Sequence, residues 1–431
     1  MILRTVAAGA AVVAAVLGIA IAWTRPAAIA PAAAPPAPPS AAVLAAGARV
    51  VALGDCMVCH TSPVGRAYAG GLGLATPFGT IYSTNITPDP DTGIGRWTSA
   101  AFRRALREGV ARDGHQLYPA FPYTHTTRMS DQDIDLAYAY LMSRTPVRVR
   151  QPDNELIFPL NFRPLLAFWN MLYLRPGDGA APGPGQVERG RYLVDALGHC
   201  AACHSGLNLL GGERNPPFGG GTVDGWHAPA LTRLASGRVP WTQDDLADYL
   251  GSGLSLAHGA AKGPMRPVTE RLAGVPRADV EAMAAYLMTI QQPARAMVAA
   301  SPQAAPALVP AAVKASGTES AGAALFAAAC ATCHGPAAPL TRLANRPALA
   351  RSSAVTGDDP ANFIQTVLHG IAWERPAPGG AAAAYMPPFG DVLSDAQVAD
   401  LAAWVRTSMA GRPAWSDVAR ASGKLRKEAR P

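Results

Sequence analysis

The stretch CAACH at residues 200–204 decides the fold of this 431-residue chain, because its spacing occurs twice more. CMVCH at residues 56–60 precedes it and CATCH at residues 330–334 follows it, and together the three copies use all six cysteines. The pattern C-x-x-C-H is the attachment signature of c-type haem. Two thiols on one helical turn can each add to a vinyl group of the porphyrin, while the adjacent imidazole reaches the iron. We therefore predict three covalently bound haem c groups, each containing iron.

Zinc binding and thiol redox chemistry are the alternative interpretations of paired cysteines. Each of the three Cys-Cys-His sets would lack a fourth zinc ligand, and a thioredoxin-like pair would need one C-x-x-C inside a βαβ unit. Haem attachment is favoured over both. The residues predicted to bind the porphyrin are Cys56, Cys59, Cys200, Cys203, Cys330 and Cys333, and the motif histidines predicted to bind iron are His60, His204 and His334.

The sequences after the first two motifs follow one frame, which indicates an internal repeat. Trp97 and Trp241 each lie 37 positions after the motif histidine, and each is followed by threonine. Gly109 and Gly253 then follow twelve positions later. The segments around these two motifs are therefore predicted to share one fold.

Each motif is also followed by an apolar stripe of helical period. Capping patterns that begin at Ser130 and Ser394 predict where the first and third of these helices start. Short helices wrapped around a haem make stable domains that would otherwise be too small, so we predict an all-α fold. The stripes are Ile134, Ala137, Tyr138 and Leu141, then Val280, Met283, Ala284 and Leu287, then Val398, Leu401, Ala402 and Val405.

Composition predicts the domain boundaries. The three predicted domains are called here the first module (41–150), the second module (186–292) and the third module (316–410). The basic end of the tail, Gly423 to Pro431, is predicted to be disordered. The remaining segments are a signal or anchor with a Pro/Ala tether (1–40), an aromatic interdomain linker (151–185), a Pro/Ala linker (293–315) and the basic tail (411–431).

The N-terminus carries an uncharged apolar run from Thr5 to Trp23, between Arg4 and Arg25. Such a run is typical of an export signal or a single membrane anchor. We favour an uncleaved anchor, because Pro31 directly follows the small residues at which a signal peptidase would cut. Either interpretation exports the body of the protein.

A second apolar stretch, Leu156 to Leu174, is not predicted to cross a membrane. It contains Pro159, Asn161 and Arg163, and each polar group would need a partner in lipid. Its aromatic residues instead predict a linker that packs on a neighbouring domain or on another subunit.

Each module is expected to supply a methionine as the second axial ligand, because a His/Met pair raises the reduction potential of haem iron. Met265 lies 61 positions after His204, and Met386 lies 52 positions after His334. Met265 follows Pro264, and Met386 precedes Pro387. Proline in a loop would hold the neighbouring sulfur rigidly. We predict that both methionines bind iron.

The first module departs from this rule. Phe121 stands 61 positions after His60, and phenylalanine cannot bind iron. Met129, eight positions later, is the favoured ligand. A His125 ligand, which would lower the potential, and an open or water-bound iron are the alternatives.

Charge and composition argue against several other functions. The chain has 37 Lys+Arg against 30 Asp+Glu, but the basic residues are scattered, so nucleic-acid binding is not predicted. No G-x-G-x-x-G follows a strand pattern, and no spare domain has the size to hold a flavin, pterin or quinone. The chain is therefore expected to transfer electrons without a catalytic site of its own.

The chain resembles the three-haem cytochrome c subunits of bacterial membrane-bound dehydrogenases, which oxidise alcohols, gluconate, fructose or aldehydes. The resemblance covers most of residues 45 to 410. Many of these subunits have methionine at the position of Phe121, and the phenylalanine form resembles the branch that accompanies molybdenum-containing aldehyde or N-heterocycle oxidoreductases. Besides the C-x-x-C-H motifs, the resemblance rests on Asn85-Ile86-Thr87-Pro88-Asp89, Gly95-Arg96-Trp97, Leu117-Tyr118-Pro119-Ala120, Gly263-Pro264-Met265 and Tyr385-Met386-Pro387-Pro388.

The resemblance implies three tandem class I cytochrome c domains at the periplasmic face of the inner membrane, as part of a respiratory chain. They would take electrons from a catalytic dehydrogenase subunit of the molybdopterin, flavin or quinone type and pass them to ubiquinone or a terminal oxidase. Two other functions remain open. One is a multi-haem peroxidase or reductase that acts at an open iron in the first module, and the other is a cytochrome subunit of a terminal oxidase.

Overall fold

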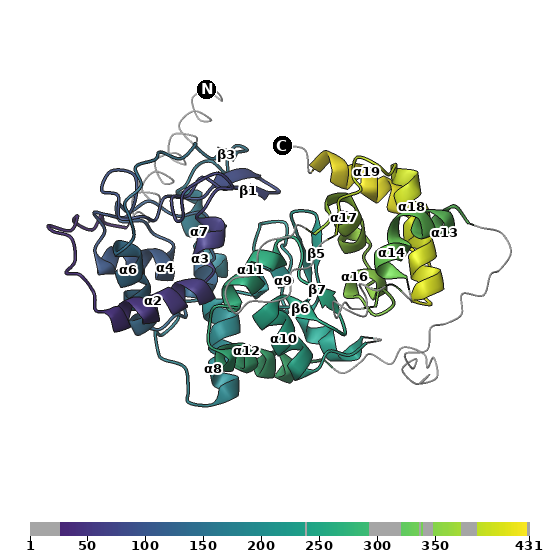
Figure 1. Cartoon of the computed structure of the whole chain (residues 1–431). Coiled ribbons are helices and arrows are strands. Elements are labelled where there is room, and N and C mark those ends of the chain that lie inside the picture. The colour runs from purple at the N-terminus through teal and green to yellow at the C-terminus, as the bar shows by residue number, and fades with distance from the viewer. Residues whose placement is uncertain are drawn as a thin grey trace, which may run out of the picture. The chain divides into compact units, whose positions relative to one another are not determined.

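The computed structural model describes residues 26–237, 239–292, 320–335, 338, 348–371 and 386–428 (Figure 1). The chain forms two compact units, Met1–His199 and Cys200–Pro431. Helices predominate in both units, and the short strands beside them were not anticipated by the all-α prediction. Among the described residues, no helix combines the length and the apolar character needed to cross a membrane. The predicted anchor, Thr5 to Trp23, and the linker 293–315 lie outside the described residues.

The first unit is built from short helices and one small sheet. Its strands β1 (Gly73–Thr76), β2 (Gly79–Tyr82) and β3 (Glu155–Leu156) pair in that order, with antiparallel neighbours. Its helices are α2 (Ala41–Leu53), α3 (Cys56–Cys59), α4 (Ser99–Glu108), α5 (Tyr123–Thr126), α6 (Asp131–Met142), α7 (Leu165–Tyr173), α8 (Gln186–Tyr192) and the π-helical turn η1 (Leu193–Leu197).

The helix that closes the first module, α6, packs against α2. Ser130 caps α6 as predicted, because its Oγ accepts a hydrogen bond from the amide of Asp133 at 3.1 Å. All four residues of the predicted stripe are buried. Gly47 of α2 permits the close approach, since a Cβ at this position would lie 2.3 Å from the carbonyl oxygen of Leu136. The predicted helix and its buried face are confirmed.

The linker after the first module packs on that module through one face of α7. Asn170 accepts a hydrogen bond from the Tyr123 hydroxyl at 2.7 Å, and the ring of Trp169 meets the same tyrosine edge-on. This contact is the predicted packing on a neighbouring domain. Other apolar side chains of the linker face outward, and Phe158 and Met171 are 84% and 72% exposed.

The second unit contains short helices and two hairpins. The hairpins pair β4 (Gly221–Val223) with β5 (Trp226–Ala228) and β6 (Leu254–Ser255) with β7 (Gly259–Ala260). The 3₁₀ turn η2 (Leu231–Ser236) and the π-helical turns η3 (Phe326–Cys330) and η4 (Val405–Met409) join the helices. The helices are α9 (Ala201–His204), α10 (Gln243–Ser252), α11 (Met265–Leu272), α12 (Arg277–Thr289), α13 (Ala321–Leu325), α14 (Ala331–His334), α16 (Ser353–Thr356), α17 (Ala361–His369), α18 (Asp395–Trp404) and α19 (Val418–Glu428).

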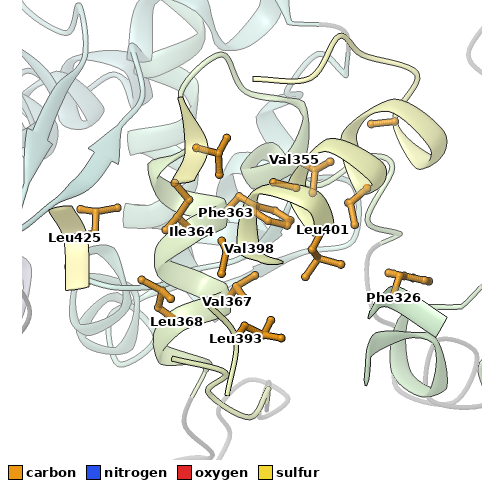
Figure 2. Close-up of a cluster of buried hydrophobic side chains, with 14 residues drawn as sticks. Phe326, Val355, Phe363, Ile364, Val367, Leu368, Leu393, Val398, Leu401 and Leu425 are labelled. Carbon is orange, nitrogen blue, oxygen red and sulfur yellow. The ribbon is translucent and has the colours of Figure 1, made fainter. Parts of the chain in front are cut away.

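A core of buried apolar side chains lies among α17, α18 and α19, and Figure 2 shows Ile364 and Val398 within it. Ser394 caps α18 in the predicted capping box, with Gln397 bonding back to the Ser394 amide at 2.8 Å. The predicted stripes on α12 and on α18 with η4 are buried. The closing helices of the second and third modules are therefore confirmed.

The end of the chain differs from the prediction. The predicted disorder of Gly423 to Pro431 is wrong for residues 423 to 428, because these residues belong to α19. Ser422 and Arg426 of α19 both donate to Asp395 Oδ1 at 2.7 Å, and Leu425 joins the core of Figure 2. The basic composition suggested that the tail is surrounded by solvent. Instead, Asp395 on α18 and the apolar side chain of Leu425 hold α19 in place.

Replacing Asp395 by asparagine is expected to loosen α19. Hydrogen bonds from Ser422 and Arg426 lower the pKa of the Asp395 carboxyl below its ordinary value of 3.8. The stabilisation is therefore complete above pH 3.8 and is lost as the pH falls through the lower pKa of the folded state. Hydrogen exchange of α19 amides should be faster in the variant at neutral pH and should converge with the wild type in acid. Equal exchange at neutral pH would contradict this role.

Hydrogen bonds join the two groups of helices in the second unit. Asn362 of α17 accepts a hydrogen bond from the amide of His227 in β5 at 2.8 Å and donates to the carbonyl of the same residue at 2.9 Å. The amide of Ser353 donates to the carbonyl of His258 at 2.9 Å. These bonds hold the part that carries the second motif against the part that carries the third.

Candidate haem-binding sites

Each C-x-x-C-H motif lies on a short helical turn formed by α3, α9 or α14. In the first two motifs the histidine amide donates to the carbonyl of the first cysteine, His60 to Cys56 and His204 to Cys200, both at 3.0 Å. A bond between positions i and i+4 places these two residues on one face of the turn. The structure therefore brings together the predicted attachment and ligand residues of the first two motifs.

All six cysteines lie within the described ranges, and all are thiols that form no disulfide. Burial, with smaller contributions from Asp55 and Cys59, raises the pKa of Cys56 to about 12. Thioether attachment needs free thiols, because each sulfur must add to a vinyl group of the porphyrin. Among the described residues, no group of three or more His, Cys, Asp or Glu side chains is arranged to hold a metal ion.

The motif histidines are oriented by main-chain carbonyls. Nδ1 of His60 lies 2.6 Å from the carbonyl oxygen of Thr84, and Nδ1 of His204 lies 2.7 Å from that of Pro229. A carbonyl only accepts, so Nδ1 carries the proton and Nε2 keeps its lone pair for iron. Burial also lowers the pKa of both imidazoles, which favours the neutral form that binds metal. Both residues thus fit the role of proximal ligand.

The repeat predicted from the first two motifs is present in the local structure. Thr98 and Thr242 cap α4 and α10, and the hydroxyl of each accepts a bond at 3.1 Å from the amide three positions on. Both helices have ten residues. They end at Gly109 and Gly253, whose φ angles of 64° and 73° lie in the left-handed region that glycine tolerates. The helices α4 and α10 therefore have the same type of N-terminal cap, the same length and the same glycine conformation at the C-terminal end.

The loops that follow these helices close in the same way. The amide of Leu117 donates to the carbonyl of Gly109 at 2.7 Å, and the amide of Ala261 donates to that of Gly253 at 2.7 Å. Counted from the motif histidine, donor and acceptor occupy the same positions in both modules. The common frame therefore extends at least as far as Leu117 and Ala261.

The common frame also reaches the position of the predicted sixth ligand. The amide of Met265 donates to the carbonyl of Lys262 at 3.2 Å, and the amide of Phe121 donates to that of Tyr118 at 3.1 Å. Both residues follow their histidine by 61 positions. Phe121 therefore has the same local main-chain bond as Met265. The chain diverges beyond this point, because Met265 begins α11 whereas α5 begins at Tyr123, beyond Phe121.

The loop before Met265 is tightly packed. Gly263 has a φ of 49° and lies against the ring of Trp226, where a Cβ would be only 2.3 Å from a ring carbon. Met265 itself is partly buried at the start of α11. The main chain beside Met265 is therefore closely packed, and its role as a ligand stays a prediction.

Met386 is held by main-chain bonds in the second unit. Its amide and carbonyl pair with those of Ile371 at 2.9 and 2.8 Å, and its side chain packs against the core of Figure 2. Gly370, with a φ of 68°, allows the close approach. Residues 372–385 of the predicted ligand loop lie outside the described residues.

Met129 is 3% exposed and directly precedes Ser130, the cap of α6. Val275 and Leu393 occupy the corresponding position before α12 and α18, and both are buried. The main chain of Met129 is fixed from both sides, because its amide donates to the carbonyl of Thr126 at 3.0 Å and its carbonyl accepts from Arg107 at 2.7 Å. The structure thus gives Met129 the setting of a core residue.

His125 is also buried, in α5. Its Nδ1 lies 2.9 Å from the carbonyl oxygen of Asp195 in η1 and 2.9 Å from Nη2 of Arg128. The contact with Asp195 holds the ring against η1, and the nearby Arg128 competes for the same nitrogen.

The residues that orient the motif histidines were not predicted from the sequence. Thr84 and Pro229 act through main-chain carbonyls, which leave no side-chain pattern. Their similar spacing, 24 and 25 positions after His60 and His204, is the only signal that could have found them. The contact of His258 was not predicted either: its ring stacks on that of Trp241, with centroids 3.6 Å apart.

Family comparisons agree with these sites. Residues 44–145 and 187–291 match the family model described as cytochrome c, and residues 317–405 match the model described as cytochrome c oxidase, cbb3-type, subunit III. Together with the thiols and oriented histidines, these matches define the protein as a c-type cytochrome. Its cytochrome c domains imply covalently bound haem c.

Curated relatives give the family. The chain is 35% identical to the cytochrome c subunit of alcohol dehydrogenase (quinone) from Gluconacetobacter polyoxogenes, over 90% of this chain and 85% of that protein. It is 36% identical to the gluconate 2-dehydrogenase cytochrome c subunit of Pantoea cypripedii, over 90% of both chains. The chain belongs to the cytochrome c subunits of membrane-bound dehydrogenases. This family membership implies a function in electron transfer.

A third relative is much longer than this chain. A nicotinate dehydrogenase subunit of Pseudomonas putida is 48% identical over 90% of this chain, but the chain spans only 32% of that protein's length.

Proposed function

We propose that the chain carries three haem c groups, one in each of three class I cytochrome c domains, and relays electrons between them. Bound haem supplies one-electron redox chemistry, and the chain's own residues hold it and set its potential. The recurrence of the motif turn in α3, α9 and α14, with an oriented histidine in the first two, carries this proposal. The attachment residues are Cys56, Cys59, Cys200, Cys203, Cys330 and Cys333, the proximal ligands are His60, His204 and His334, and Met265 and Met386 are sixth ligands.

The electron donor is a separate dehydrogenase subunit, and the acceptor is ubiquinone or a terminal oxidase. The likeness to dehydrogenase cytochrome subunits over 90% of the chain supports this assignment. The complex works at the periplasmic face of the bacterial inner membrane, with residues 5–23 as the anchor. The apolar N-terminal run supports this location.

The donor subunit is of the molybdopterin, flavin or quinone type. Phe121 favours a partner that oxidises an aldehyde or an N-heterocycle, because the phenylalanine form resembles that branch of the family. The 48% identity to a nicotinate dehydrogenase subunit gives further support.

A cytochrome subunit of a terminal oxidase is the second candidate function. It is supported by the match of residues 317–405 to a family described as an oxidase subunit. The match concerns only the third module, whereas the likeness to dehydrogenase subunits covers most of the chain.

Purification of the tagged full-length chain from solubilised membranes of its own host tests the proposal. We expect a dehydrogenase subunit to copurify in a fixed ratio. Substrate of that subunit, added without oxygen, should reduce the haem c spectrum, and a ubiquinone analogue should reoxidise it. Copurification with a copper-containing oxidase, or haem that stays oxidised when substrate is turned over, would contradict the proposal.

A further inference from the structure

Phe121 stands where the common frame of the first two modules requires a sixth ligand. We infer that the iron of the first module has no ligand from the protein on this side and binds a small neutral diatomic ligand such as carbon monoxide. The inference rests on the proposed function, because it assumes a haem at Cys56, Cys59 and His60. It replaces Met129 as the expected ligand.

The first step is that Phe121 occupies the position that the common frame gives to Met265, and that local contacts hold it there. Its amide donates to the carbonyl of Tyr118, as that of Met265 donates to Lys262, and its own carbonyl accepts from the amide of Tyr123 at 2.8 Å. Its ring meets the Tyr123 ring edge-on, with centroids 6.2 Å apart. The loop therefore shares one main-chain bond with the loop of Met265, while the Phe121 side chain lacks a donor atom.

The second step is that Tyr123 locks this loop in place. Tyr123 is fully buried, and its ring covers Gly109, where a Cβ would lie 2.6 Å from a ring carbon. Its hydroxyl donates to Asn170 at 2.7 Å. Moving Phe121 aside to admit another ligand would disturb this packing.

The third step concerns Met129, whose position is that of a core residue in every module. Val275 and Leu393, which cannot bind iron, fill the same place before α12 and α18 and are buried there. A buried apolar residue just before a helix cap packs on the first turns of that helix. This packing, and the two main-chain bonds of Met129, explain its burial without iron.

The fourth step concerns His125, the other nitrogen donor considered for this iron. It lies four positions beyond the ligand position, in α5, and its Nδ1 contacts the carbonyl of Asp195 at 2.9 Å. The proposed ligand His60 makes the same kind of Nδ1–carbonyl contact, so the His125→Leu variant below decides between an open iron and a histidine ligand.

The side chain at position 121 also selects the class of ligand. The polarity and hydrogen-bond donors of the pocket decide what binds to an open haem iron. A phenyl ring offers no donor to stabilise a bound anion. It therefore favours neutral diatomic molecules over cyanide or azide.

Carbon monoxide titration of the dithionite-reduced full-length protein tests the inference, after its haem content has been measured. We expect the reduced protein to bind one carbon monoxide molecule for every three haems. In the oxidised protein, one of the three haems should give a high-spin ferric signal. Phe121→Met should abolish the binding and add a sulfur-to-iron charge-transfer band. The matched change in the second module, Met265→Phe, should raise the stoichiometry from one to two.

The outcomes separate this inference from the proposed function. Fewer than three haems per chain would overturn the proposed function and the inference together. Three haems with no carbon monoxide binding would overturn the inference alone. In that case, binding gained in Met129→Leu or in His125→Leu would identify the ligand. Wild-type binding that Phe121→Met leaves unchanged would also overturn it.

Discussion

Replacing Met265 by leucine is expected to lower one midpoint potential of the holoprotein by on the order of 0.1 V, within the roughly 0.8 V range that axial ligands span. Methionine as sixth ligand raises the potential of haem iron, and leucine keeps the size of the side chain but has no sulfur. The packing of Gly263 on Trp226 should keep the loop in place. Met386→Leu should lower the midpoint potential of a different haem in the same way.

Spectroelectrochemical titration of the three potentials checks this prediction. Each variant should also lose one sulfur-to-iron charge-transfer band. Met283→Leu is the matched control, because Met283 is buried in the core face of α12 and is not a predicted ligand. It should leave all three potentials unchanged. The ligand assignment is wrong if the Met265 and Met386 variants behave like this control.

Replacing Arg406 by methionine is expected to destabilise the third module by roughly 3 kcal/mol, since each buried polar group left without a partner costs about 1–3 kcal/mol. Arg406 is 4% exposed. It donates to the carbonyls of Val355, Gly357 and Pro413, each at 2.6 Å. Its guanidinium also lies 4.0 Å from the centre of the Trp415 ring. Lysine should recover only part of the loss, because it lacks the planar fork of donors.

Hydrogen exchange of α17 and α18, measured by mass spectrometry on the holoprotein, gives the local free energy of opening. Arg412→Met is a suitable control, because Arg412 pairs at 2.7 Å with an Asp358 side chain that is 96% exposed. Such a surface pair contributes about 0–1 kcal/mol. If α17 and α18 open with the same free energy in the Arg406 and Arg412 variants, the buried bonds of Arg406 do not have the proposed effect.

The repeat and the closing helices could be predicted because they depend on regular spacing. The interval from His60 to Thr98 equals that from His204 to Thr242, and both threonines cap a helix in the structure. The apolar stripes, such as Ile134 to Leu141 on α6, follow helical period and are buried. Local signals of this kind need no knowledge of tertiary contacts.

Features that depend on tertiary contacts could not be predicted. The carbonyls of Thr84 and Pro229 orient the motif histidines, but any residue has a carbonyl. The basic tail folds as α19 because Asp395, far away in sequence, accepts its hydrogen bonds. In the first module, the sequence alone does not separate a ligand methionine from a core methionine. The structure shows that Met129, Val275 and Leu393 are all buried, and carbon monoxide titration tests whether Met129 binds iron.

Haem content per chain is the most direct test of the account. The exported, matured protein should contain three haems by pyridine haemochrome assay, and its denatured mass should exceed that of the polypeptide by three covalently bound porphyrins. Replacing Cys200 and Cys203 together by alanine should reduce both values to two. A colourless mature protein, or a denatured mass that carries fewer than three porphyrins, would contradict the account.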